Sequence, residues 1–159
     1  MKGRQDGPEM FNQTPTYKKA KDMLEASYKD GDTYFVVGRS TSFDDTTQPI
    51  SYDQGDEKGD SGLDAINGVF TVPKDGKYVF NFQGASGEAN TVLSIRLKDG
   101  KKLATTSYTM VARQDISKGG SVSMGTTANL KKGDTVSVVL EEGQLQGDSV
   151  FMGKLISSL

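Results

Sequence analysis

The segment from Gly68 to Phe82, GVFTVPKDGKYVFNF, constrains the fold of this chain more than any other. It contains two alternating strand-like segments joined by the sequence PKDG at 73–76, which is typical of a turn. Successive side chains of a strand point to opposite faces, so Tyr78, Phe80 and Phe82 share one face of the second segment. Because this apolar face needs a covering sheet, the segment predicts a two-sheet all-β domain.

Composition limits both the size of the protein and its chemistry. The chain has 159 residues, 34% of them hydrophobic, enough for one domain with a modest core. It has no cysteine and no histidine, which excludes disulfides, thiol catalysis, histidine-based triads and the usual zinc sites. A net charge of -2 lacks the basic excess typical of nucleic-acid-binding proteins. We expect no nucleic-acid partner.

No segment of the sequence is suited to membrane insertion. A membrane span needs roughly 18 consecutive apolar residues, and no segment approaches this. The first ten residues are polar and do not form a secretory signal. If the protein is secreted, we expect its leader to be absent from this sequence.

Residues 1–32 differ in character from the rest, and we predict a domain boundary between 1–32 and 33–159. In residues 16–29 the apolar positions recur on one helical face, with Thr14 or Thr16 as cap and Gly31 as stop. Such a short helix is marginal alone in water. It could be the end of a coiled-coil stalk, a helix packed on the domain, or part of a linker. The face consists of Tyr17, Ala20, Leu24 and Tyr28.

Short strands with Gly and Asp between them follow from residue 33 onward. Asp99-Gly100 favours a hairpin, and residues 53–64 read as an acidic, glycine-rich loop. This pattern favours a sandwich or jelly roll of about ten strands. The predicted strands are 33–39, 49–52, 69–72, 78–82, 91–98, 103–111, 121–130, 135–140 and 149–156.

The acidic residues do not form a recognisable catalytic or metal site. The loop at 53–64 has several carboxylates, which calcium prefers, but Gly55 and Lys58 break the EF-hand spacing, and a solvated loop explains it. Glu141 and Glu142 are adjacent, and adjacent residues on a strand face opposite ways, so they cannot flank one bond. We predict that the chain is not an enzyme; a carboxylate-based hydrolase is the alternative.

Five motifs in order resemble the globular head of complement C1q, within the C1q/TNF-like jelly-roll superfamily. The family pattern of an aromatic strand, a proline turn and Gly-x-Tyr-x-Phe is met at 68–80. The resemblance covers about residues 33–159 and implies a C1q/TNF-like jelly roll. The other motifs are the opening pair at 34–37 and 49–52, DGKKL at 99–103, LKKGDTVSV at 130–138 and SVFMGKLI at 149–156.

The chain departs from the family pattern at several positions. Lys154 stands where the family usually has an aromatic residue, and Val72 where a cysteine is common. Calcium-binding members carry two aspartates before the strand that resembles 121–130, and Thr109 corresponds to the first. The second falls in the predicted loop at 115–120. The resemblance therefore implies Asp115 as the one candidate ligand for Ca2+, and we predict no other cofactor.

The resemblance implies a secreted homotrimer whose heads bind a protein or carbohydrate ligand multivalently, in innate recognition or cell-surface adhesion. The alternative is a structural trimerisation cap of a fibre, matrix or coat protein. Arg113, Asp115 and Lys118 form a charged cluster in one predicted loop, and we predict Arg113 and Lys118 as ligand-binding residues. Solvation of a loop would equally place these charges there.

Overall fold

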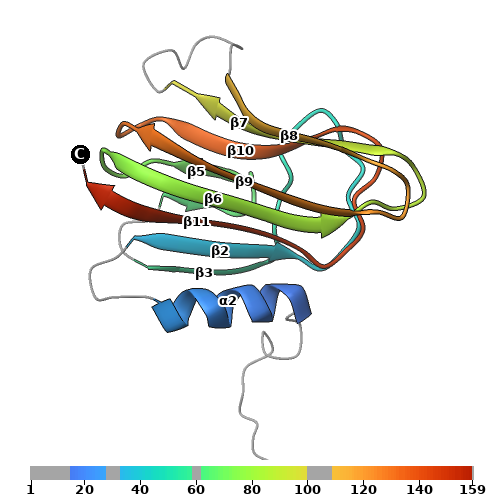
Figure 1. The fold of residues 1–159 in the computed structure, drawn as a ribbon, viewed down its shortest axis with the longest axis horizontal. Helices are drawn as coiled ribbons and strands as arrows, with labels where there is room; N and C mark the ends of the chain where they lie inside the picture. Colours follow the sequence, from blue (N-terminus) through green and yellow to red (C-terminus); the bar gives the residue numbers. More distant parts are fainter. Residues whose placement is uncertain (1–14, 28–32, 59–61, 100–108, 159) are drawn as a thin grey trace, which may run out of the picture.

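The structure, a computed structural model, describes residues 15–27, 33–58, 62–99 and 109–158. Within them, antiparallel strands form two five-stranded sheets that pack face to face, and one helix lies outside (Figure 1). We call them the β10 sheet, with the order β4-β5-β10-β7-β8, and the β11 sheet, with the order β3-β2-β11-β6-β9. The predicted all-β sandwich is confirmed.

The turn of the Gly68–Phe82 segment connects the two sheets. β5 precedes this turn and β6 follows it, and they lie in different sheets, so the turn does not close a hairpin. The β10 sheet consists of β4 (Leu63–Asp64), β5 (Val69–Thr71), β7 (Thr91–Lys98), β8 (Thr109–Ile116) and β10 (Thr135–Glu142). The β11 sheet consists of β2 (Tyr34–Arg39), β3 (Gln54–Lys58), β6 (Gly76–Ala85), β9 (Ser121–Leu130) and β11 (Ser149–Ser158).

Aromatic rings fill the core between the sheets. Tyr78, Phe80 and Phe82 of β6 are all buried, as the alternation predicts. Phe35 of β2 and Phe70 of β5 come from opposite sheets, and their ring centroids lie 4.9 Å apart. Such a pair contributes about 0.5–1.5 kcal/mol beyond the area that it buries. The core therefore joins the two sheets through aromatic contacts.

Two predictions between residues 49 and 64 are wrong. Residues 49–52 do not form a strand: the backbone N–H of Ile50 donates to Val138 at 2.9 Å, whereas that of Tyr52 donates to Ala65 at 2.9 Å. The predicted acidic loop instead contains β3, which pairs with β2 along its whole length. Pairing satisfies the backbone of β3 although its sequence, QGDEK, has low β propensity.

The predicted position of the strand before residue 120 also needs correction. β8 begins at Thr109 and continues past the predicted end to Ile116. Arg113 and Asp115 therefore lie on a strand and not in a loop. Gly100 of the predicted hairpin, and the predicted strand before residue 109, lie outside the described residues.

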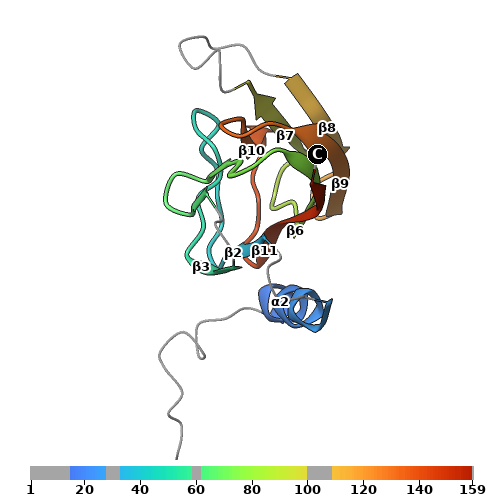
Figure 2. The same ribbon diagram turned by 90° about the vertical axis from the view of Figure 1, so that its left-hand side faces the viewer.

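The helix α2 (Pro15–Ser27) confirms the predicted helix and packs on the domain, which is one of the three alternatives. Pro15 suits the first helical turn, where no backbone N–H is needed. Tyr17 and Ala20 are buried against Val36 of β2 and Val150 of β11, and Figure 2 shows α2 outside the sandwich next to these strands. The boundary at residue 32 stays a prediction.

No helix within the described residues is both long and apolar enough to cross a membrane. Thr14, Tyr28 and Gly31 lie outside the described residues.

Candidate functional site

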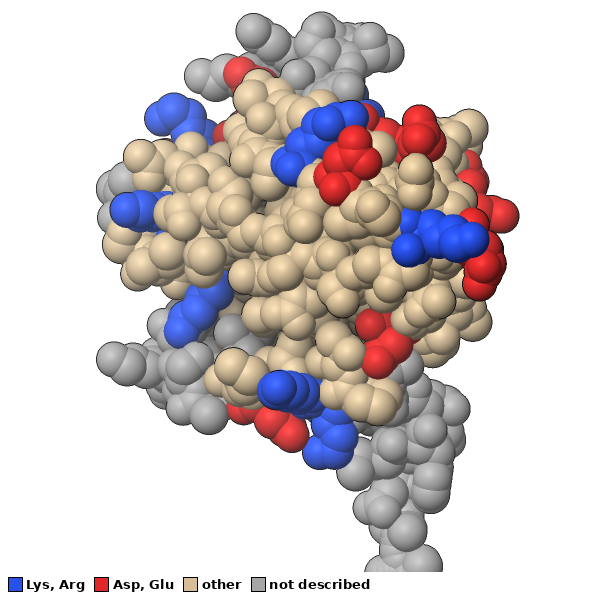
Figure 3. Space-filling model, turned by 45° about the vertical axis from the view of Figure 1, so that its right-hand side comes forward, with Lys and Arg blue, Asp and Glu red and all other residues tan. Residues whose placement is uncertain are grey.

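The outer side of β6 and β9 carries almost no charge. Tyr78, Phe80 and Phe82 of β6 point into the core, so the alternate residues of β6 and those of its partner β9 point outward. Lys77 and Lys154 lie at one end. Figure 3 shows a broad uncharged area on this side of the molecule, with charged side chains around it. We call the following residues the β6–β9 face: Val79, Asn81, Gln83, Ser123, Gly125, Thr127, Asn129 and Met152.

Asn81 lies at the centre of the β6–β9 face with an unsatisfied carbonyl group. It pairs with Met152 of β11 on one side and Gly125 of β9 on the other. Its side-chain oxygen Oδ1 is buried and accepts no hydrogen bond from the described residues. A buried acceptor without a donor costs about 1–3 kcal/mol. Because Oδ1 has almost no exposed surface, a donor from a second molecule could reach it only after the amide rotates outward.

α2 covers the adjoining part of the same sheet, over β2 and β11. Tyr17 lies directly against Gly38 of β2, so close that a Cβ on Gly38 would be 2.9 Å from Cβ of Tyr17. Thr16, at the start of the helix, donates two hydrogen bonds to the carboxylate of Asp148 in the loop before β11. The helix therefore has both a fitted apolar contact and a polar anchor, and the β6–β9 face stays open beside it.

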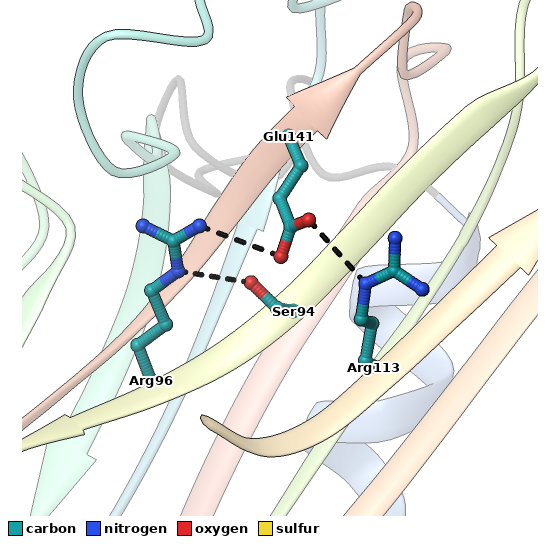
Figure 4. Close-up of polar contacts among 4 residues, drawn as sticks. All are labelled: Ser94, Arg96, Arg113 and Glu141. Atoms are coloured by element: carbon teal, nitrogen blue, oxygen red, sulfur yellow. Dashed lines mark hydrogen bonds and ion pairs between the residues drawn. The ribbon is translucent and has the colours of Figure 1, made fainter. Parts of the chain in front are cut away.

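A charged cluster occupies the outer side of the β10 sheet (Figure 4). Nη2 of Arg96 on β7 lies 3.4 Å from Oε2 of Glu141 on β10, and Nε of Arg113 on β8 lies 3.4 Å from Oε1. Nε of Arg96 also donates to Oγ of Ser94 at 3.1 Å. Three neighbouring strands thus place two guanidinium groups on one carboxylate.

The pKa of Glu141 is set by two opposing effects. Burial raises it, but the contacts with Ser94, Arg96 and Arg113 outweigh burial and hold the pKa of this carboxyl below its ordinary value. Glu141 is therefore ionised at neutral pH. One carboxylate cannot neutralise two arginines, so the cluster carries excess positive charge.

A pocket of about 410 Å³ adjoins this cluster. We call it the β7–β10 pocket; residues 46–49 form one wall and the outer side of the β10 sheet forms the floor. Ile50 N–H bonds to β10, and the backbones of Phe43 and Leu145 exchange two hydrogen bonds of 2.9 Å, so the wall is tied to the sandwich at both ends. The floor consists of Val69, Arg96, Lys98, Thr135, Ser137 and Val139.

The three residues predicted in one loop lie on two elements. Arg113 and Asp115 lie on β8, with Arg113 paired to Glu141 and Asp115 exposed opposite Val92. Lys118 lies in the following turn, where its backbone N–H donates to Oδ1 of Asn90 at 3.0 Å. The described residues contain no group of three or more acidic, histidine or cysteine side chains suited to a metal ion. The calcium role of Asp115 and the ligand-binding roles of Arg113 and Lys118 stay predictions.

Sequence reasoning missed Arg96 and Lys98. Alternation over residues 91–98 indicates that both lie opposite the apolar positions of β7, so their shared outward face could have been found. The wall at 46–49 gives no such local indication, because it depends on where a distant loop packs.

A family model described as "C1q domain" matches residues 34–156. The globular domain of zebrafish complement 1qA protein is similar at 23% identity and a TM-score of 0.62, covering 80% of this chain and 99% of that one. A crystal structure of murine APRIL at pH 8.5 is similar at 14% identity and a TM-score of 0.60, covering 78% and 99%. At such identities these structures show the fold alone, and they confirm the predicted jelly roll. No curated protein matches the chain.

Proposed function

The chain belongs to the C1q domain family, and on that basis we propose that it is the ligand-binding head of a secreted homotrimer. C1q domains are non-enzymatic recognition or structural modules and are typically extracellular. Proteins of the C1q and TNF-like type form trimers. The proposed ligands are proteins, glycans or microbial surfaces, bound in innate recognition or cell-surface adhesion.

The main support for the proposed trimer is the uncharged character of the β6–β9 face. Charged residues are depleted from the cores of protein interfaces, and in a chain of which 25% is charged the only described charged residues beside this face are Lys154, opposite Val79, and Lys77, opposite Asn129, at one end. Asn81 at its centre is partly exposed, and rotation of its amide would present the unpaired carbonyl oxygen to a neighbouring copy. Because α2 covers β2 and part of β11, the open face spans β6, β9 and the exposed part of β11.

Trimerisation would give the head its binding strength. Three identical sites on one rigid body can engage a patterned surface together, and linking sites raises the effective concentration of each later binding event. A weak single site is therefore sufficient for useful affinity. This arrangement suits ligands that repeat, such as surface glycans.

Sedimentation equilibrium at micromolar concentration tests the trimer. We expect three times the chain mass of 17.1 kDa, and we expect Asn81→Lys to shift the protein to monomers because it inserts charge into the β6–β9 face. Thr71→Lys is the matched control, since Thr71 is exposed on β5 of the other sheet. A monomeric wild-type protein would overturn the proposed assembly.

The alternative function, a structural trimerisation cap, uses the same β6–β9 face but needs no ligand site. Glycan and protein arrays separate the two functions. Binding by the wild-type trimer that weakens strongly in the Asn81→Lys monomer supports the recognition head. A stable trimer that binds nothing on either array supports the cap.

A further inference from the structure

We propose that the β7–β10 pocket binds an acidic sugar, with Arg96 and Lys98 contacting its anionic group. This inference rests on the proposed recognition function and specifies one ligand class and one site. The pocket lies on the β10 sheet, whereas the β6–β9 face belongs to the opposite sheet. Assembly through that face leaves the pocket accessible.

The charge of the pocket favours an anion. Arg96 and Lys98 line it, and none of its lining residues is acidic, although the chain as a whole is acidic with a net charge of -2. Lys98 forms no ion pair with any described residue. Since the two cations are two residues apart on one side of β7, their backbones lie roughly 7 Å apart. Both can reach a single carboxylate or sulfate group.

Two carboxylates near the pocket are already engaged. Glu141 is shared between Arg96 and Arg113. Asp45, beside the wall, accepts hydrogen bonds from the backbone N–H and Oγ1 of Thr47 at 2.8 and 2.6 Å, and from Nε2 of Gln48 at 2.8 Å. Its charge therefore orders the wall, and no carboxylate of the described residues forms an ion pair with Lys98.

The remaining lining suits a hydroxyl-rich ligand. Ser137 lies opposite Arg96 and Thr135 opposite Lys98 across the β7–β10 pairing, so each cation has a hydroxyl beside it. Thr46 and Thr47 add hydroxyls from the wall. A sugar carries hydroxyl groups around its ring and apolar C–H faces, and Val69, Val139 and Pro49 offer apolar surface for the latter.

The pocket has the size and the rigidity that such a ligand needs. Small-molecule sites span about 300–1,000 Å³, and a volume of about 410 Å³ accommodates a monosaccharide or disaccharide. The floor is a paired sheet and the wall is held by the backbone bonds of Phe43 and Ile50. Binding therefore requires little ordering of the protein, which would otherwise reduce the affinity.

Amide chemical shifts of the full chain, titrated with glucuronic acid and N-acetylneuraminic acid, test this proposal. We expect saturable shifts concentrated at residues 46–48, 96–98 and 135–137, and none with methyl glucoside, a neutral sugar. Lys98→Gln should weaken binding by about tenfold, since a hydrogen bond to a charged group has roughly that effect. Lys77→Gln, an exposed lysine on the other sheet, should leave binding unchanged.

Three results would overturn the proposal: equal shifts with the neutral sugar, shifts centred elsewhere, or undiminished binding by Lys98→Gln. Tighter binding of a short polyglutamate peptide at the same amides would replace the sugar with an acidic protein ligand. Sedimentation of the same samples keeps the two proposals separable. A monomer that binds acidic sugars contradicts only the trimer, and a trimer that does not bind them contradicts only the pocket.

Discussion

Asp148 caps a helix that lies 132 residues earlier in the chain. Its Oδ1 accepts a hydrogen bond from the backbone N–H of Thr16 at 3.1 Å, and its Oδ2 accepts one from Oγ1 of Thr16 at 2.8 Å. Asp148 has a φ of 67°, a left-handed conformation that aspartate tolerates better than most residues. The loop before β11 is thus shaped to hold α2, and the helix is part of the domain's packing.

Replacing Asp148 should release the helix without unfolding the sandwich. Asp148→Ala removes the cap, at a cost of about 1 kcal/mol, and adds a cost of roughly 1–2 kcal/mol for a left-handed alanine. Asp148→Gly removes only the cap, and Asp148→Asn keeps an acceptor. Hydrogen exchange should therefore show faster exchange of the α2 amides for Ala and Gly than for Asn. Unchanged protection of α2 in all three would contradict the anchoring role.

Gly38→Ala should displace α2 by steric conflict. The new Cβ would lie 2.9 Å from both Cβ and Cδ1 of Tyr17, which is too close for either backbone to remain in place. Tyr17→Ala removes Cγ and Cδ1 from this contact and keeps only Cβ, so a double variant should lose less stability than the two single costs together. Denaturant unfolding of the four proteins measures this coupling. Strict additivity would mean that the two residues do not contact each other in solution.

The fold was largely predictable because its strands have strong local patterns. The predicted limits 91–98 and 121–130 are those of β7 and β9, since alternation and turn residues mark both ends. The strand at 54–58 could not be predicted from a local pattern, because it forms only by pairing with β2. The wrong prediction at 49–52 has the opposite cause. These residues have a strand-like composition, but their backbone groups bond to two different elements.

The candidate site was less predictable because it joins distant segments. The outward position of Arg96 and Lys98 follows from local alternation. The surroundings of these two residues do not follow from the local sequence, because Glu141 comes from β10 and residues 46–49 come from a loop held by other strands. The partnership of Asp148 with Thr16 likewise has no local sequence pattern, and the predicted caps were residues near the helix itself.

Gly153→Ala should destabilise the aromatic core. Gly153 of β11 pairs with Phe35 on one side and Phe80 on the other, and an added Cβ would lie 2.5 Å from Cε2 of Phe35 and 2.8 Å from Cδ1 of Phe80. Overpacking of this kind costs about 1–3 kcal/mol. Gly55→Ala on the edge strand β3 lies outside the β6–β9 face and is the control, because the atom nearest to its new Cβ is Cγ1 of Val37 at 3.2 Å. Chemical denaturation should show a lower midpoint for the Gly153 variant alone.

The contribution of Glu141 to stability should depend on pH in one direction. Its contacts with Ser94, Arg96 and Arg113 lower its pKa in the folded protein, so the unfolded chain takes up a proton at higher pH than the folded one does. The stabilisation is therefore complete above the ordinary value of 4.5 and is lost as the pH falls through the lower folded-state pKa. Thermal unfolding from pH 7 to pH 3 should show Glu141→Gln less stable than wild type at neutral pH, with the difference shrinking in acid. Glu142→Gln, a change at the exposed neighbour, should follow the wild type throughout. A difference between Glu141→Gln and wild type that stays constant down to pH 3 would show that the carboxylate charge does not stabilise the fold.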